Sequence, residues 1–236
     1  MGYVVLTRDP VKDARLSARL DAAGIPHVGV PLLRHAPGPD RDVLHERLRE
    51  RWNWIIVTSP TAASFLLEAW DRAGRPGLRI AAIGKSTARA LEEGGVPVAY
   101  TSPQAYGERL ANELGGAGRV LWPTSALAGG GMEKVLGKRG FDLVRLDVYL
   151  TLPRRLSEDE RLTLSNATVA ALASPSAVRA WAEATPARPP VAAIGRVSAK
   201  AALKAGFEQV WFPDNPGLEG WAQVVCDVYK RFSSPE

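Results

Sequence analysis

The chain has 236 residues, with 30 Lys and Arg against 25 Asp and Glu, which gives a net charge of +5 at pH 7. This length suits one large domain or two small ones, and the composition is ordinary for a packed globular protein. The single cysteine excludes an internal disulfide, no apolar run approaches the length of a membrane-spanning helix, and the N-terminus lacks a signal-peptide pattern. We therefore expect a cytoplasmic protein with no membrane partner.

Short apolar segments alternate with helical patterns along the whole chain. Residues 60–70 place their apolar side chains at the spacing of one helix face, after Ser59 and Pro60 as N-cap and first helical residue. Segments that are apolar throughout are typical of parallel strands covered on both faces. The predicted strands lie near residues 3–7, 28–33, 54–58, 79–83, 97–100, 119–122, 143–148, 168–173, 190–194 and 209–212.

The chain contains one internal duplication. Residues 55–100 resemble residues 169–211, with matching Ser-Pro and Ala-Ile-Gly motifs, and residues 3–33 align more weakly with residues 119–149. The repeat period of about 115 residues is too long for a solenoid unit, for which 20–50 residues is usual. The pattern therefore predicts two duplicated domains.

Two equivalent segments, 31–37 and 147–153, are extended and bounded by proline. If they pair, the chain enters a second domain near residue 38 and returns near residue 150. The predicted fold class is α/β, with two similar open parallel-sheet domains of about five strands each, helices on both faces, and a two-stranded linker. The predicted domains are residues 1–36 with 151–236, which form a discontinuous first domain, and residues 38–148.

Several common site motifs are incomplete. The sequence at 83–87 ends like a phosphate-binding loop, but Arg79 stands where its first glycine belongs, and Lys134 replaces the third glycine of a dinucleotide fingerprint. The three histidines share no spacing with other metal ligands. Residues 41–52 predict a mixed-charge amphipathic helix whose charges alternate, which favours a solvated face over nucleic-acid contact. We expect no cofactor, no metal and no nucleic-acid partner.

Small hydroxyl and glycine residues recur where predicted strands give way to helices. In open α/β sheets these turns lie at the carboxyl ends of the strands, where ligands bind, and helix N-termini there suit carboxylates or phosphates. One such turn alone is weak evidence, since Ser and Thr cap helices everywhere. Together the turns predict an anion-lined cleft, toward which the net positive charge would steer an acidic ligand. The turns are Thr7-Arg8, Thr58-Ser59, 84–87, Thr101-Ser102, Thr124-Ser125, 174–176 and 195–198.

At these residues the chain resembles the uroporphyrinogen-III synthase family. The resemblance rests on an ordered set of short motifs that spans nearly the whole chain: VLTR (5–8), Pro31-Leu32, TSP-x-A (58–62), AIG-x-x-T-A (82–88), VYLT (148–151), SPSAV (174–178) and AIG-x-x-S-A (193–199). The resemblance implies two α/β domains joined by a two-stranded linker, with the active site in the cleft between them.

The resemblance also implies a reaction. Hydroxymethylbilane, a linear tetrapyrrole with eight carboxylates, is closed to uroporphyrinogen III with loss of water and inversion of ring D. Loss of the hydroxyl gives an azafulvene, which the far pyrrole attacks to form a spiro intermediate, and no cofactor takes part. Because this substrate cyclises unaided to the wrong isomer, the main task of the protein would be to hold a bent conformation.

Site residues follow by position from the resemblance. Tyr149 matches the hinge tyrosine of the family, which would help the hydroxyl to leave; alternatively it packs the linker against a domain. Substrate-binding positions are Arg8, Thr58, Ser59, Gly84, Thr87, Ser125, Ser174, Gly195 and Ser198. Ser198 has the alternative interpretation of a plain helix cap. The sequence departs from the family pattern where Pro123-Thr124-Ser125 replaces an Arg-Gly pair and where Asp9 separates Arg8 from Pro10.

A non-catalytic module that binds a tetrapyrrole or another polyanion on the same scaffold is the alternative function. A nucleotide-sugar or periplasmic-type binder is disfavoured by the missing nucleotide loops and signal peptide. We expect a monomer whose partner is a small polycarboxylate, and the family would place it in haem, sirohaem or cobalamin synthesis.

Overall fold

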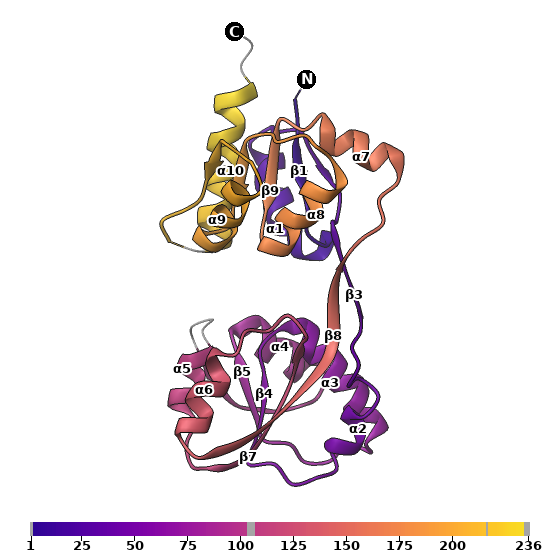
Figure 1. Ribbon diagram of the computed structural model, residues 1–236, viewed down its shortest axis with the longest axis vertical. Helices are drawn as coiled ribbons and strands as arrows, with labels where there is room; N and C mark the ends of the chain where they lie inside the picture. Colours follow the sequence, from indigo (N-terminus) through magenta and orange to yellow (C-terminus); the bar gives the residue numbers. More distant parts are fainter. Residues whose placement is uncertain (1, 103–106, 216, 234–236) are drawn as a thin grey trace. The chain divides into compact units, whose positions relative to one another are not determined.

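The computed structural model describes residues 2–102, 107–215 and 217–233. The chain divides into two compact units, as Figure 1 shows: unit 1 consists of Met1–Arg34 with Leu152–Glu236, and unit 2 consists of His35–Thr151. The domain boundaries expected from the sequence lie within a few residues of this division.

Unit 1 is an open parallel sheet with helices on both faces. Its described strands follow the order β11-β10-β9-β1-β2, and every neighbouring pair is parallel. Its elements are β1 (Val4–Leu6), α1 (Pro10–Ala22), β2 (His27–Gly29), α7 (Glu158–Ser165), β9 (Val169–Leu172), α8 (Pro175–Ala184), β10 (Val191–Ala193), α9 (Arg196–Lys204), β11 (Val210–Trp211) and α10 (Leu218–Ser233).

Unit 2 repeats this plan around the strand order β3-β8-β7-β4-β5-β6. The pairs from β8 through β6 are parallel. The elements, of which the first and last strands also reach into unit 1, are β3 (Leu33–Pro37), α2 (Leu44–Arg47), β4 (Trp54–Val57), α3 (Pro60–Arg72), β5 (Ile80–Ile83), α4 (Lys85–Glu93), β6 (Val98–Ser102), α5 (Gly107–Glu113), β7 (Gly118–Ser125), α6 (Gly131–Lys138) and β8 (Phe141–Pro153).

The strand orders confirm the internal duplication. Each sheet reverses its direction of growth once, between β9 and β1 in unit 1 and between β4 and β7 in unit 2. Matching β9, β10 and β11 to β4, β5 and β6, and β1 and β2 to β7 and β8, gives the same order for these five strands in both units, as the sequence repeat predicts. Ligands of open α/β sheets bind at such a reversal point, at the carboxyl ends of the strands. The predicted α/β fold class is confirmed.

The sheet of unit 2 has six described strands, whereas about five are expected from the sequence. The predicted strand at 28–33 is two strands, β2 and β3, and the predicted segments at 143–148 and 147–153 are one strand, β8. The amide of Gly38 donates to Val148 O (2.9 Å), and the amide of Arg154 donates to Leu32 O (2.8 Å). The residue number therefore falls along one strand as it rises along the other, so β3 runs antiparallel to β8.

Alternate residues of each strand pack on opposite faces of its sheet. In β4, Ile55 and Val57 pack against α2, α3 and α4, whereas Trp54 and Ile56 pack against α5 and α6. Figure 1 shows α5 and α6 on one side of this sheet and α2 and α3 on the other. This double coverage is why the strands are apolar throughout rather than alternating.

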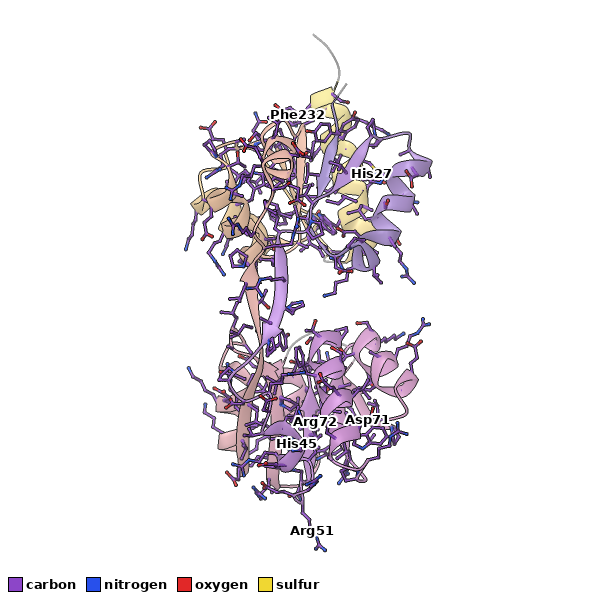
Figure 2. The ribbon with its side chains drawn as sticks, turned by 90° about the vertical axis from the view of Figure 1, so that its right-hand side faces the viewer. His27, His45, Arg51, Asp71, Arg72 and Phe232 are labelled. Carbon is purple, nitrogen blue, oxygen red and sulfur yellow. The ribbon has the colours of Figure 1, made fainter. Side chains whose placement is uncertain are left out.

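The helix predicted over residues 41–52 is wrong in extent. Only Leu44–Arg47 is helical, and the buried contacts of this segment come from Leu44 and Leu48. Arg51 points away from the body of unit 2 (Figure 2). The alternating charges of the segment are compatible with a solvated helix, but so short an apolar face supports one helical turn only.

Candidate active site

Unit 2 contains a cavity of about 920 Å³ at the carboxyl ends of β4 and β5, where the N-termini of its helices gather. This volume falls in the upper part of the range of about 300–1,000 Å³ that small-molecule sites occupy. The cavity is at the reversal point of the sheet, since Thr58 directly after β4, Ile83 of β5 and Trp122 of β7 all line it. Its lining residues are Thr58, Ser59, Pro60, Ile83, Gly84, Ser86, Thr87, Gly107, Glu108, Arg109, Asn112, Glu113, Trp122, Gly129, Gly131 and Met132.

Four of the predicted substrate-binding residues meet in this cavity: Thr58, Ser59, Gly84 and Thr87. Ser59 is the N-cap of α3, as the sequence predicts, and its Oγ accepts a hydrogen bond from the amide of Ala62 (3.0 Å). Thr87 belongs to the first turn of α4 and is 1% exposed. The Ser-Pro turn and the glycine turn therefore place their polar groups at one site.

Gly84 ends β5 and is the N-cap of α4. Its φ of 79° and ψ of 147° lie in a region that side-chain-bearing residues rarely adopt, so the turn requires glycine. Among the described residues no side chain caps α4. Apart from the Thr87 amide, which donates to Gly84 O (3.1 Å), the N–H groups of its first turn, with the positive end of the helix dipole, are therefore available to an anion.

Tyr149 packs inside unit 2 beside this site, although it is not itself among the residues that line the cavity. The side chain is 7% exposed, its ring stacks on Phe65 (centroids 5.7 Å apart, planes 3° apart) and it meets the ring of His35 edge-on. Its hydroxyl is 3.1 Å from Oγ of Ser59, a residue that lines the cavity. The two interpretations of Tyr149 are therefore compatible, because the ring packs and the hydroxyl joins the polar network of the site.

Ser125 is not brought to the cavity wall. It ends β7, and its Oγ accepts from the amide of Leu127 (3.2 Å), which shapes the loop that follows. The guanidinium of Arg145 holds this loop: it donates to the carbonyl oxygens of Ser125, Ala126 and Ala128 at 3.2–3.3 Å, and its Nε donates to Asp147 (2.8 Å). The loop therefore contributes its backbone through Gly129 and Gly131, whereas the Ser125 side chain stays within the loop.

The site also contains charged groups that the sequence analysis missed. Arg109 and Glu113 of α5 line the cavity, and Nε of Arg109 donates to Glu113 (2.7 Å). Hydrogen bonds from Tyr100 and Arg109 lower the pKa of Glu113, so this carboxylate is ionised and paired. The four-residue spacing of Arg109 and Glu113 could have been found in the sequence, because it is the spacing of helical ion pairs.

In unit 1 the corresponding turns carry Ser174, Gly195 and Ser198. Ser174 caps α8 by accepting from the amide of Ala177 (3.1 Å), with a backbone conformation (φ −159°, ψ 156°) close to that of Ser59 (φ −156°, ψ 154°). Gly195 is the N-cap of α9, and Ser198 is 4% exposed inside that helix. Interpreting Ser198 as the helix cap is therefore wrong.

Arg8 lies at a second cavity, of about 450 Å³, which belongs to unit 1. Nη1 of Arg8 is 3.6 Å from Oδ1 of Asp13, and the Arg8 amide donates to Oδ2 of Asp13 (3.0 Å). Burial raises the pKa of Asp13, although the Arg8 charge opposes this shift. Asp13 was missed by the sequence analysis; its signal is an acidic residue in the first turn of α1.

Of the histidines, His27 lines the same cavity and shares a 2.6 Å hydrogen bond with Ser17, whereas His45 bonds to Asp42 O (2.7 Å). Figure 2 labels these two side chains. No group of three or more metal-ligating side chains occurs in the described part of the chain. None of the helices in that part is both long and apolar enough to cross a membrane.

These features define a duplicated α/β protein with a ligand-sized cavity at the reversal point of one of its two sheets. The family model described as uroporphyrinogen-III synthase HemD matches residues 14–223. The chloroplastic uroporphyrinogen-III synthase of Oryza sativa subsp. japonica is 37% identical over 245 residues, which cover 96% of this chain and 80% of the relative. The chain belongs to the uroporphyrinogen-III synthase family, which confirms the resemblance seen in its motifs.

Solved structures agree on the fold. The uroporphyrinogen-III synthetase of Helicobacter pylori gives a TM-score of 0.71 at 16% identity, covering 97% of this chain and 100% of that chain. A mutant uroporphyrinogen III synthase of Thermus thermophilus gives a TM-score of 0.65 at 20% identity, covering 98% and 100%. With the family shown, the protein is an enzyme of tetrapyrrole biosynthesis that acts on a small-molecule substrate.

Proposed function

We propose that this chain is a carbon–oxygen lyase that closes hydroxymethylbilane to uroporphyrinogen III, with loss of water and inversion of ring D through a spiro intermediate, and without a cofactor. The observation that carries the proposal is the cavity of unit 2, where two helix N-termini without side-chain caps face a ligand-sized space. Such N-termini bind carboxylates, of which this substrate carries eight.

The contrast among the helices of unit 2 supports this assignment. The N-terminus of α3 is capped by the Ser59 side chain. In contrast, α4 and α6 have the N-caps Gly84 and Gly130 and receive no cap from a side chain of the described residues. A glycine N-cap leaves the amides of the first turn open and lets a ligand approach the backbone. The cavity therefore offers donors fixed by the fold, which suits an enzyme whose task is to hold one conformation of a flexible polyanion.

Two glutamates, Glu108 and Glu113, line the cavity, and the second of them does not oppose such a ligand strongly. Glu113 is paired with Arg109 and accepts from Tyr100, so its charge is compensated inside the protein. Arg109 adds a guanidinium to the same wall, and its Nη atoms suit a carboxylate. The remaining predicted residues, Arg8, Ser174, Gly195 and Ser198, would bind carboxylates from unit 1.

We assign the catalytic role to Tyr149. Its hydroxyl, supported by Ser59, would donate a hydrogen bond to the departing hydroxyl of the substrate, so that the C–O bond breaks as a proton reaches the leaving oxygen and water departs. The azafulvene that remains is then attacked by the far pyrrole. The ring of Tyr149 is packed in the core, and the hydrogen bond with Ser59 orients its hydroxyl.

The test is the isomer ratio of the product. Purified protein given freshly made hydroxymethylbilane should yield the type III isomer, which chromatography separates from the type I isomer of the unaided reaction. Tyr149→Phe should lower turnover by about 10–100-fold, the lower range for a general acid. Ser59→Ala or Ser174→Ala should weaken substrate binding only modestly, because backbone amides remain.

Type I product alone would refute the proposal. Tight binding of the substrate without turnover would instead indicate the non-catalytic tetrapyrrole-binding module. An unchanged rate for Tyr149→Phe would leave this residue with its packing role only.

The units would act as two domains joined by β3 and β8, in a monomer without a nucleic-acid partner. Size-exclusion chromatography with light scattering tests the monomer, and limited proteolysis near residues 36 and 151 tests the boundaries. A cytoplasmic location stays a prediction, since the rice relative is chloroplastic, and cell fractionation would test it.

A further inference from the structure

Trp122 is the exception among the buried tryptophans of this protein. Five of the seven tryptophans donate their indole N–H to a backbone carbonyl at 2.7–3.1 Å: Trp52 to Arg47, Trp54 to Gly115, Trp70 to Pro76, Trp181 to Ala187 and Trp221 to Ala192. Trp122 is 3% exposed, and its Nε1 is shielded from solvent without a hydrogen-bond partner in the described part of the chain.

An unpaired N–H of this kind is unfavourable for folding. A buried donor without an acceptor costs about 1–3 kcal/mol, and folded proteins rarely leave one. The apolar contacts of Trp122 with the core of α5 and α6, which includes Met132 and Leu136, would be available to a purely apolar side chain. The hydrogen-bonding capacity of the indole nitrogen is therefore not used within the described part of unit 2.

The position of Trp122 relates this N–H to the proposed ligand. Trp122 lines the cavity of unit 2 together with Gly131, in the first turn of α6, whose N-cap Gly130 provides no side-chain cap. The guanidinium carbon of Arg145 lies 5.4 Å from the centroid of the indole ring. An indole N–H can only donate, so its partner must be an acceptor, and a carboxylate oxygen is the acceptor that the proposed ligand supplies.

We propose that Trp122 is a substrate-binding residue whose Nε1–H donates to a carboxylate oxygen of the acidic tetrapyrrole in the cavity of unit 2. This inference rests on the proposed function and deepens it, because it assigns one carboxylate to a side-chain donor on the cavity wall. Since Nε1 is shielded, a neighbouring side chain must move to admit the carboxylate. Met132 lines the same cavity, and its unbranched, flexible side chain suits such a movement.

The direct test follows the indole N–H signals of the full-length, ¹⁵N-labelled protein by two-dimensional NMR. Titration with uroporphyrinogen III under anaerobic conditions should move the Trp122 signal downfield in proportion to binding, as a new hydrogen bond forms. Trp122→Phe assigns the signal. The Trp54 N–H serves as the control, because it lies in the same core and already donates to Gly115 O (3.1 Å), so its signal should stay in place.

A second experiment separates binding from folding. Replacing Trp122 with benzothienylalanine keeps the shape of the indole but substitutes sulfur for the N–H. This change should weaken binding of the product about 10–100-fold, the worth of one hydrogen bond to a charged group, and leave the urea midpoint unchanged or higher. The same replacement at Trp54 should lower the midpoint and leave binding unchanged, because it removes an internal hydrogen bond.

These experiments distinguish failure of the Trp122 inference from failure of the proposed function on which it rests. If the wild-type protein makes the type III isomer but the Trp122 signal stays fixed on binding, the present inference is overturned and the proposed function stands. Equal losses of stability at Trp122 and Trp54 would likewise overturn the inference. If no type III isomer forms and no ligand binds, the proposed function fails, and the inference fails with it.

Discussion

The hydrogen bond between Tyr149 and Ser59 predicts that these side chains stabilise unit 2 as a coupled pair. Oγ of Ser59 accepts from the amide of Ala62 at 3.0 Å and lies 3.1 Å from the hydroxyl of Tyr149. Ser59→Ala therefore removes a helix cap and also leaves the phenol of a residue that is 7% exposed without its partner. Tyr149→Phe removes only the second interaction.

The magnitudes follow from the separate interactions. Loss of an N-cap costs about 1 kcal/mol, and loss of one buried hydrogen bond costs about another 1 kcal/mol. Ser59→Ala should therefore lower the free energy of unfolding by about 2 kcal/mol and Tyr149→Phe by about 1 kcal/mol. The double variant should lose about 2 kcal/mol rather than about 3, which is a coupling energy of about 1 kcal/mol.

Urea unfolding of all four proteins, followed by circular dichroism and tryptophan fluorescence, measures this cycle. Ser174→Ala is the matched control, because Ser174 caps α8 with nearly the same backbone geometry, and it should lose only about 1 kcal/mol, the worth of a cap. Effects of Ser59→Ala and Tyr149→Phe that add within about 0.3 kcal/mol, as for independent sites, would refute the coupling and leave the hydroxyl of Tyr149 without a structural partner.

Three further predictions concern the backbone and one buried acid. Gly84→Ala should lower the free energy of unfolding by about 1–3 kcal/mol because of its positive φ, as a urea titration would measure. Gly195, the corresponding N-cap of unit 1, has a φ of 178° and carries no such backbone strain. Gly38→Ala should lower the free energy of unfolding by about 1–3 kcal/mol, because the added Cβ would lie 2.0 Å from Asp147 O. A calorimetric unfolding midpoint equal to that of the wild type would contradict this contact. Burial raises the pKa of Asp13 above its ordinary 3.8, so the folded state binds this proton more tightly than the unfolded state, and the wild type loses stability as pH rises through the raised pKa. The stability of Asp13→Asn relative to the wild type should therefore increase with pH across that window. A stability difference that does not depend on pH would argue against this reasoning.

The duplicated architecture could be predicted from the sequence because its signals are local and occur twice. Apolar strands covered on both faces, Ser-Pro caps and a repeated glycine turn each depend on neighbouring residues, and the second copy checks the first. The N-caps Ser59 and Ser174 have backbone angles within a few degrees of each other, which is the structural expression of that repeat.

The errors occurred where a distant contact overrides the local pattern. Residues 41–52 have the charge pattern of a helix, but the segment before Leu44 is held to β8 by hydrogen bonds from the amides of Gly38 and Asp40, which delay the start of α2. The split of 28–33 into β2 and β3 has a similar cause, because Leu33–Pro37 pairs with β8 and not with the sheet of β1. The pattern of one strand does not reveal which sheet it joins.

The site residues divide in the same way. Ser59, Gly84 and Thr87 could be found because their turns have a sequence signature, whereas the seven tryptophans look alike in the sequence. Only the packed structure shows that Trp122 lacks the backbone acceptor that five others have. An unpaired donor is a property of three-dimensional surroundings, so no single-sequence pattern could have identified it.

Comparison of the two units shows which polar side chains of unit 2 have no counterpart in unit 1. When Gly24 is aligned with Gly140, Tyr149 corresponds to Leu33, so the Ser-Pro turn of unit 1 has no matching phenol at that position. Trp122 likewise corresponds to Leu6, an apolar core residue without a donor. The Ser-Pro caps and the order of five strands are the same in both units, whereas these polar groups occur in one, so the shared fold does not require them. The proposed binding and catalysis would account for their presence in unit 2, which is why we assign the proposed reaction to the Tyr149 side of the duplication.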